Sequence, residues 1–322
     1  MTRRIASLSL DLDNEWSYLK THGADSWKDF PSYLDIVTPH ILRVCDDHDL
    51  TITVFVVGQD AALPRNQDAL AMLGESRHEI GNHSFHHEPW LHLKPGPEIH
   101  DELTAAHQAI AAATGKEPIG FRGPGFSLSL DTLRSLEELG YSYDCTTLPT
   151  FIGPFARAYY FRHSALDEAD RKTRTRLFGT IGEVFRPIKP YAWDLGNDAL
   201  LVEMPVTTMP FLRIPIHFSY LLFLARYSEA TADLYFRTAL GVCRLTGVQP
   251  SILVHPLDLL GGDDVDSLGF FPAMDMRGEH KRALVGKYIA RLADSFDILT
   301  LADHVRAVAS DGLKNRNPSF ST

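Results

Sequence analysis

Five short segments of the sequence carry side chains that could act together on one metal ion. They are Asp11-Leu12-Asp13, His83 to His87, Arg122 to Ser127, Asp144, and Val254-His255-Pro256. A carboxylate, two imidazoles and an open position make a catalytic Zn²⁺ site. A second carboxylate and a further histidine could supply a base and an acid beside it. Because hydrolysis of an unactivated amide at neutral pH needs such a set, the first hypothesis is a metal-assisted amide hydrolase.

The two aspartates are separated by one residue. On a strand, Asp11 and Asp13 therefore have the same side-chain parity and point into one site. Two carboxylates that lie close together repel each other unless a cation neutralises them, and a metal on one with a salt bridge to the other would do so. The alternative is a strand-end turn with two capping aspartates.

The histidine-rich segment offers a chelating pair. His83 and His87, at i and i+4, share a helical face or a tight loop and can bind one ion. His86 and His92 lie close by and complicate the choice, and the alternative is a group of solvent-exposed histidines. The metal is favoured because Asn82-His83-Ser84 directly follows a predicted strand.

Two further side chains stand at strand ends. Arg122 is held by Gly123-Pro124-Gly125, and rigid turn residues suit an arginine that clamps a carboxylate through two hydrogen bonds. A surface arginine in a tight turn is the alternative. His255 ends an apolar strand, where a purely structural histidine is also common, and Asp258 is a candidate to orient it or to tune its pKa.

Short apolar runs alternate with helical patterns along the chain. The predicted strands are Ile5–Leu10, Thr51–Val57, Glu79–Asn82, Ile119–Phe121, Tyr141–Tyr143, Leu200–Met204, Ser251–Val254 and Phe296–Thr300. The predicted helices are Tyr33–His48, Glu98–Thr114, Asp131–Leu139 with Asp131 as N-cap and Gly140 as C-terminal glycine, Ala230–Thr246 and Gly278–Ser295. This alternation predicts an α/β fold with a parallel sheet or barrel.

Every segment that carries candidate site residues falls at or just beyond the carboxyl end of a predicted strand, where the active sites of barrels lie.

The composition excludes several classes of protein. With 322 residues, 44% hydrophobic and 22% charged, the chain can bury a core. Its net charge of −10 argues against nucleic acid as a partner. The three cysteines lack CxxC spacing and are interpreted as small buried hydrophobes in a reduced compartment. No apolar run follows the first residues and none reaches the roughly 18 residues of a membrane span, so a cytoplasmic protein is expected.

Two irregular stretches, 147–199 and 205–229, interrupt the alternation. We expect one domain over residues 1–310 that contains both, followed by a tail at 311–322. Within the second stretch, Phe211–Leu224 predicts a buried helix; the alternative is an apolar lip that contacts a lipid-linked substrate or a membrane surface. The oligomeric state cannot be inferred from the sequence.

At these residues the sequence resembles the polysaccharide deacetylase family, the NodB-homology group of carbohydrate esterases, in its branch without signal peptides. The matching segments are Ser9-Leu10-Asp11-Leu12-Asp13-Asn14, His83-Ser84-Phe85-His86-His87, Arg122 to Ser127, and Leu253-Val254-His255. The resemblance implies a distorted (β/α) barrel with seven or eight parallel strands and a catalytic domain over about residues 1–310.

The resemblance also implies roles for these residues. Asp11 is the general base, held by Arg122, and His255 is the general acid. The metal ligands are Asp13, His83 and His87, and the expected cofactor is a divalent metal, Zn²⁺ first. The fourth family motif matches less well: Asp144 lies in the right region, where it or a nearby backbone N–H is expected to hold the oxyanion, but Leu148 replaces the aromatic residue and Trp193 is the candidate substitute.

Three functions remain open at this point. The first is removal of an N-acetyl or N-formyl group from an aminosugar that is free, polymeric or lipid-linked. The second is hydrolysis of a cyclic amide or ureide such as allantoin. The third is a catalytically silent carbohydrate-binding barrel, which the complete set of site residues argues against.

Overall fold

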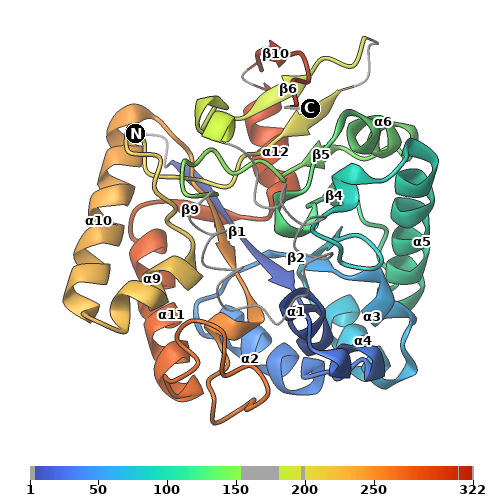
Figure 1. Ribbon diagram of the computed structural model, residues 1–322. Coiled ribbons are helices and arrows are strands. Elements are labelled where there is room, and N and C mark those ends of the chain that lie inside the picture. Colours follow the sequence, from blue (N-terminus) through green and yellow to red (C-terminus); the bar gives the residue numbers. More distant parts are fainter. Residues whose placement is uncertain (1–3, 154–180, 197–199, 311, 321–322) are drawn as a thin grey trace.

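The computed structural model describes residues 4–153, 181–196, 200–310 and 312–320. Within them, one curled sheet of ten strands runs in the order β10-β6-β7-β5-β4-β3-β2-β1-β8, and β9 also pairs with β1 (Figure 1). The strands are β1 (Ile5–Leu12), β2 (Thr53–Val56), β3 (Glu79–Asn82), β4 (Gly120–Phe121), β5 (Tyr143–Asp144), β6 (Tyr191–Trp193), β7 (Leu201–Glu203), β8 (Ser251–Val254), β9 (Asp297–Leu299) and β10 (Asn315–Arg316). All neighbouring pairs are parallel except β6 with β7.

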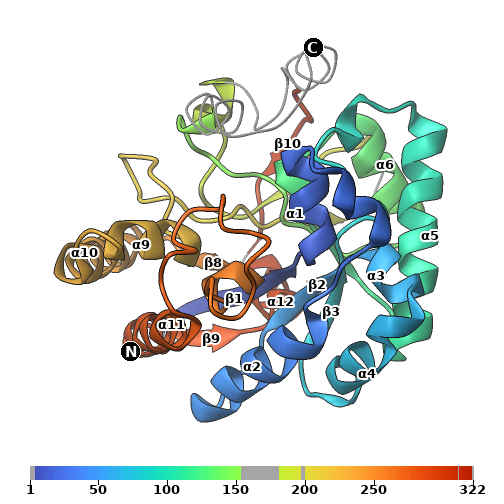
Figure 2. The same cartoon turned by 60° about the horizontal axis from the view of Figure 1, so that its bottom comes forward.

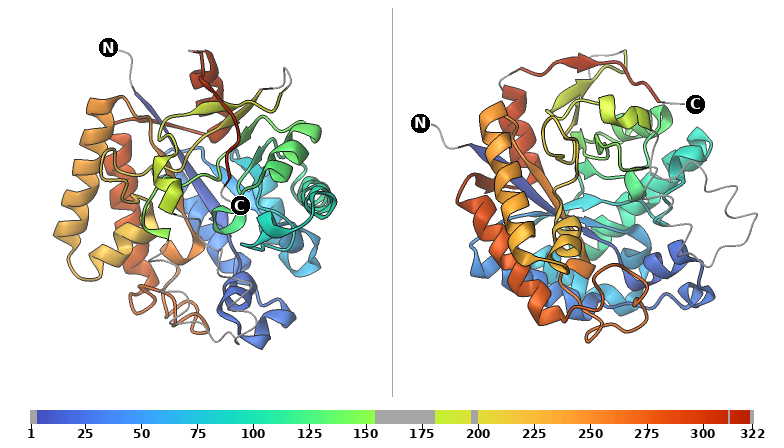
Figure 3. Two further views of the ribbon diagram at one scale, coloured as in Figure 1. Left: turned by 45° about the horizontal axis from the view of Figure 1, so that its top comes forward. Right: turned by 60° about the vertical axis from the view of Figure 1, so that its left-hand side comes forward.

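Helices cover the outside of this sheet, with α9, α10 and α11 on one flank and α5 and α6 on the other (Figures 1 and 3). The α-helices are α1 (Glu15–His22), α2 (Leu34–Asp47), α3 (Gly58–Ala62), α4 (Gln67–Glu75), α5 (Gly96–Thr114), α6 (Leu130–Glu138), α9 (Phe218–Ala225), α10 (Glu229–Thr246), α11 (Gly278–Ala293) and α12 (Leu301–Ser310). The 3₁₀ turns are η1 (Asp25–Asp29), η2 (Pro64–Asn66), η3 (Leu91–Leu93), η4 (Pro124–Phe126), η6 (Ile181–Phe185) and η7 (Pro256–Asp258). No helix in the described ranges is both long and apolar enough to cross a bilayer.

The sequence of β1 explains why this strand can serve two environments. Ala6, Leu8, Leu10 and Leu12 alternate with Ser7, Ser9 and Asp11, and all of them are buried. The apolar set lies in the main core with residues of the covering helices. The polar set faces the inside of the barrel. Asp11 belongs to this set, so its carboxylate lies in the interior while the regular alternation of apolar and polar residues along the strand is kept.

The amino end of the barrel is closed by α12. The backbone N–H of Leu301 donates to Thr53 Oγ1 (2.7 Å), and that of Ala302 donates to Glu79 Oε2 (3.0 Å). Thr53 and Glu79 are the first residues of β2 and β3. Leu301 and further apolar residues of α12 pack in the same buried cluster as Phe55. The carboxyl end is therefore the end at which the barrel can hold a reaction site.

The predicted barrel is confirmed. Each of the eight predicted strands corresponds to one of the parallel-paired strands, and each of the five predicted helices is present. The N-cap of α6 was predicted wrongly: Ser129, not Asp131, accepts a hydrogen bond from the N–H of Thr132. Gly140 does take the left-handed conformation (φ 75°) that ends the helix. The predicted helix within Phe211–Leu224 exists as α9, but Phe211 precedes it and is 83% exposed.

Candidate active site

Four strands of the barrel deliver the predicted site residues to one place. Asp11 and Asp13 lie at the end of β1, His83 follows β3, Arg122 follows β4 and His255 follows β8. Figure 2 brings forward the end of the sheet at which β1 leads into α1. The side chains meet there because neighbouring parallel strands present their carboxyl ends at the same edge.

Asp13, His83 and His87 form a group, here called the ligand group, that could hold a metal ion. Asp13 Oδ1 lies 2.9 Å from His87 Nε2 and 3.2 Å from His83 Nε2, and one ligand atom from each residue falls within 4.8 Å of the others. Asp13 Oδ1 and His87 Nε2 are buried and have no partner in hydrogen-bond geometry. Buried acceptor atoms that lack a hydrogen-bond donor and lie close together are suited to a bound cation. One carboxylate with two imidazoles is a common set of zinc ligands.

The charge and tautomer of these ligands also fit a cation. Burial raises the pKa of Asp13, but His87 and His83 lower it more strongly, so that the pKa lies well below its ordinary value and the carboxyl stays ionised. His83 Nδ1 lies 2.6 Å from the carbonyl oxygen of Arg122, to which it donates in the tautomer that leaves Nε2 free. The Arg122 segment therefore orients a metal ligand with its backbone.

The His83–His87 segment is a tight loop, the second of the two conformations expected. Ser84 (φ 61°) and His87 (φ 49°) adopt left-handed backbone conformations that are costly for residues other than glycine. Glu102 of α5 holds the loop, because its Oε1 accepts from the N–H of Phe85 (3.0 Å) and of His86 (2.6 Å). The ring of His86 turns away from the ligand group and pairs with the same Glu102 (2.6 Å).

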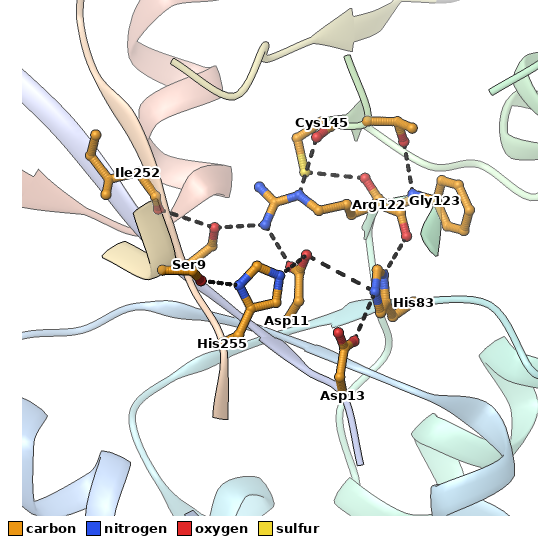
Figure 4. Close-up of polar contacts among 12 residues, drawn as sticks. Ser9, Asp11, Asp13, His83, Arg122, Gly123, Cys145, Ile252 and His255 are labelled. Carbon is orange, nitrogen blue, oxygen red and sulfur yellow. Dashed lines mark hydrogen bonds and ion pairs between the residues drawn. The ribbon is translucent and has the colours of Figure 1, made fainter. Parts of the chain in front are cut away.

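Arg122 is fully buried and binds Asp11. Its Nη1 donates to Asp11 Oδ1 (2.6 Å) and to Ser9 Oγ (2.9 Å), and its Nε donates to the carbonyl of Cys145 (3.1 Å) (Figure 4). The guanidinium lies 4.6 Å from the ring centre of Phe55. Burial lowers the pKa of Arg122, but the charge of Asp11 outweighs it, and the pKa lies above its ordinary value. The arginine is thus a permanent cation that orients the Asp11 carboxylate.

His255 faces the free side of Asp11. Asp11 Oδ2 lies 4.0 Å from His255 Nε2 and 4.0 Å from His83 Nε2, so this carboxylate lies between the ligand group and His255 (Figure 4). The other ring nitrogen, His255 Nδ1, lies 3.0 Å from Ser219 Oγ. No pattern in the sequence marks Ser219, which belongs to the apolar helix α9.

Asp144 and Trp193 are connected to the site less directly. Asp144 is fully buried beside Glu203 on the neighbouring strand, and burial raises the pKa of both carboxyls. Trp193 Nε1 donates to Glu203 Oε2 (3.2 Å), and its ring packs in a buried cluster with Tyr191. Trp193 therefore contacts Asp144 only through Glu203, a residue that sequence reasoning missed.

The expected oxyanion donor next to Asp144 is not free. The N–H of Cys145 donates to the carbonyl of Phe121 (2.9 Å), and that of Thr147 donates to Glu203 Oε1 (3.0 Å). Neither of these two N–H groups is left to hold an oxyanion. The physical reason differs for the two groups: the hydrogen bond of Cys145 continues the pairing of β5 with β4, whereas the N–H of Thr147 satisfies the buried carboxyl group of Glu203.

Tyr18 of α1 is a second residue that sequence reasoning missed. Its hydroxyl is buried at the wall of the site, and its ring contacts Phe271 edge-on at 5.2 Å. Burial and the charges of Asp13 and Asp258 raise the pKa of Tyr18 well above 10.0, so the hydroxyl remains a neutral donor beside the ligand group. In the sequence it is one aromatic residue of a short helix, with no pattern that marks it.

The curled sheet and the strand-end group of Asp13, His83 and His87 place the protein in the class of (β/α) barrels with a candidate metal site at the carboxyl ends of the strands. Residues 26–143 match the family described as Polysaccharide deacetylase. Over these residues the match confirms the resemblance to polysaccharide deacetylases seen in the motifs. The matched residues include His83, His87 and Arg122, whereas Asp11, Asp13 and His255 lie outside them.

Curated relatives match only part of the chain. A 105-residue segment is 34% identical to the peptidoglycan-N-acetylmuramic acid deacetylase PdaA of Bacillus subtilis and covers 32% of this chain and 39% of that protein. A 155-residue segment is 24% identical to the peptidoglycan deacetylase of Helicobacter pylori and covers 47% of this chain and 52% of that protein. The chain thus spans about half or less of the curated relatives that it matches.

Two solved structures share the fold along nearly the whole chain. One is a Mycobacterium smegmatis protein provisionally described as a polysaccharide deacetylase, with a TM-score of 0.63, 19% identity and coverage of 98% of this chain and 95% of that one. The other is Puue allantoinase, with a TM-score of 0.56, 15% identity and coverage of 96% and 92%. At these identities the likeness concerns the fold alone.

The ligand group predicts about one divalent ion per chain in protein purified without chelator, as elemental analysis would measure. The double variant His83→Ala/His87→Ala should lose that ion because two of its three ligands are gone. His280→Ala is the matched control, since His280 lies on the surface of α11 and pairs with Glu229. Stoichiometric metal in the double variant would contradict this site.

Proposed function

We propose that the protein is a metal-dependent amide hydrolase that removes an N-acetyl or N-formyl group from an aminosugar, with Zn²⁺ as the metal. The observation that carries this proposal is the position of Asp11, which lies between the Asp13–His83–His87 group and His255 and is held by Arg122. The names of the two bacterial relatives, both peptidoglycan deacetylases, support an N-acylated sugar as substrate.

The chain's own residues divide the acid–base work. Asp11 takes a proton from the attacking water through Oδ2, while Arg122, which also donates to Ser9, donates to Asp11 Oδ1 and holds the carboxylate in place. His255 gives a proton to the departing nitrogen, so that water and amide become a carboxylic acid and an amine. A divalent ion held by Asp13, His83 and His87 would polarise the acyl carbonyl and acidify a water.

A screen over three substrate classes tests the proposal. Metal-replete protein is incubated with N-acetylated aminosugars, formamido sugars and cyclic ureides, and release of acetate or formate is measured beside ring opening. Acetate or formate from the sugars, absent with Asp11→Asn, supports the proposal. Ring opening of a ureide with no small acid released would replace it with the cyclic amide hydrolase, and no turnover in any class would favour a silent carbohydrate-binding barrel.

The second irregular stretch bears on the shape of the substrate. Residues 154–180 and 197–199 of the first stretch lie outside the described residues. In the second, α9 reaches the active site through Ser219, and the ring of His217 lies 6.2 Å from that of His255. Before α9, Phe211 and Leu212 are 83% and 57% exposed and form an apolar tip. These positions support a bounded, partly apolar acceptor site.

We therefore predict faster hydrolysis of a short N-acetylated saccharide or lipid-linked sugar than of a long chitin-like chain. A long chain would have to pass the wall that α9 forms beside His255, whereas a short substrate can enter at one end. Initial rates at equal concentrations of N-acetyl groups measure the difference. A clear preference for the long chain would show that the stretches leave the site open.

A further inference from the structure

We propose that Ser219 is a positioning residue that fixes the orientation and tautomer of His255 by linking it to Asp258. The inference rests on the proposed function, because that function assigns His255 as the proton donor. It adds a residue from α9 to a site whose candidate metal ligands, arginine and proton donor come from the carboxyl ends of barrel strands.

Ser219 contacts both His255 and Asp258, whereas the side chains of His255 and Asp258 form no hydrogen bond with each other. Ser219 Oγ lies 3.0 Å from His255 Nδ1 and donates to Asp258 Oδ2 at 3.0 Å. The direct distance from His255 Nδ1 to Asp258 Oδ2 is 3.9 Å, which is too long for a hydrogen bond. The serine hydroxyl therefore stands between the imidazole and the carboxylate.

Counting protons fixes the direction of each hydrogen bond. An ionised carboxylate only accepts, and a serine hydroxyl has a single hydrogen to donate. In the tautomer that carries the proton on Nδ1, His255 donates to the oxygen of Ser219, and the hydrogen of the serine goes to Asp258. His255 Nε2 is then the nitrogen that faces Asp11, and it is available to receive and release the proton that the reaction needs.

The three partners are held by separate elements. Asp258 Oδ2 also accepts from the backbone N–H of His255 (2.8 Å), which closes the η7 turn. Buried Lys281 of α11 donates to the carbonyls of Leu257 and Leu260, both at 2.9 Å, and fixes this turn from behind. Ser219 is presented by α9, whose Phe218, Leu221 and Leu222 are buried in the main core. Small movements of the hydroxyl are therefore resisted on both sides.

The inserted hydroxyl also has a chemical consequence. A carboxylate in direct contact with an imidazolium stabilises the charged form strongly. With Ser219 between them, Asp258 orients the ring while its charge stays one atom farther away. The arrangement therefore fixes the imidazole ring with Nε2 toward Asp11.

Ser219→Ala tests the proposal. We expect kcat to fall about ten- to a hundredfold, a part of what a general acid contributes, with KM changed less than about twofold. Ser219→Thr retains a hydroxyl and should restore most of kcat. Side-chain ¹⁵N–¹H correlation spectra, with His255 assigned by comparison with His255→Ala, should show the Nδ1-protonated tautomer in the wild type and its loss in Ser219→Ala.

The matched control is Ser228→Ala, which removes an N-cap from neighbouring α10 without touching the site. An equal fall in kcat in this variant would overturn the proposal, because stability alone would then explain the effect. Unchanged kcat and an unchanged His255 tautomer in Ser219→Ala would overturn it as well. The spectra need no substrate, so they decide the role of Ser219 even if the screen refutes the proposed hydrolysis.

Discussion

Asp11→Asn should lower kcat by at least about a hundredfold, the usual scale for a general base, while metal content stays unchanged. The asparagine keeps the size of the side chain and an oxygen for Arg122, but its amide cannot take a proton from water. Asp11 is also outside the ligand group, whose carboxylate oxygen comes from Asp13. Rates with the best substrate of the screen, together with elemental analysis, measure the two effects separately.

His255→Ala should cause a loss of the same order for the complementary reason, since the departing nitrogen then receives no proton from the chain. Its metal content should also remain that of the wild type, because His255 Nε2 points at Asp11 and not at the ligand group. If Asp11→Asn stays near wild-type activity, the base has been assigned to the wrong residue. Loss of metal in either variant would mean that the ligand group extends beyond Asp13, His83 and His87.

Arg122→Met should destabilise the protein by about 3–5 kcal/mol, because it leaves the Asp11 carboxylate buried without its partner. The midpoint of urea-induced unfolding measures the change. The double variant Asp11→Asn/Arg122→Met should recover part of the loss, since no unpaired charge then remains in the interior. Activity should be absent from both variants.

A surface pair provides the control for the arginine. Arg77→Met removes the partner of Asp49 from a pair of similar length, 2.7 Å against 2.6 Å, but the side chains of this pair are 46% and 91% exposed. Water screens such a pair, so this variant should unfold close to the wild-type midpoint. If Arg122→Met were as stable as Arg77→Met, the buried pair would not hold the site together.

Eight strands were predictable because most of them are apolar runs with β-branched or aromatic residues between turn signals. β6 and β10 were not, since three and two residues carry no period and these strands exist only through their pairing with distant parts of the chain. The same limit explains the cap of α6: Ser129 and Asp131 are both good capping residues, and only the path of the chain decides between them.

Some residues of the site were predictable from the sequence and others were not. The ligands and Arg122 were predictable because each follows a strand, and parallel strands bring their carboxyl ends together. Ser219 was not, because a single serine in an apolar helix has no local mark of its contact with His255. Glu203 was hidden for a related reason: it lies in a run that predicts a buried strand, and only the register with β5 places it against Asp144.

The pairing of β1 has a consequence for how the protein is made. This strand pairs with residues 53–56, 251–254 and 297–299, so two of its three partners are synthesised long after the strand itself. All three candidate ligands exist once His87 has been made, but His255 follows 168 residues later (255 minus 87). At about 5–20 residues per second, that interval is roughly 8–34 s. A nascent chain in this interval would contain the three candidate ligands but not His255, the proposed proton donor, so its capacity to take up metal would precede its capacity to react.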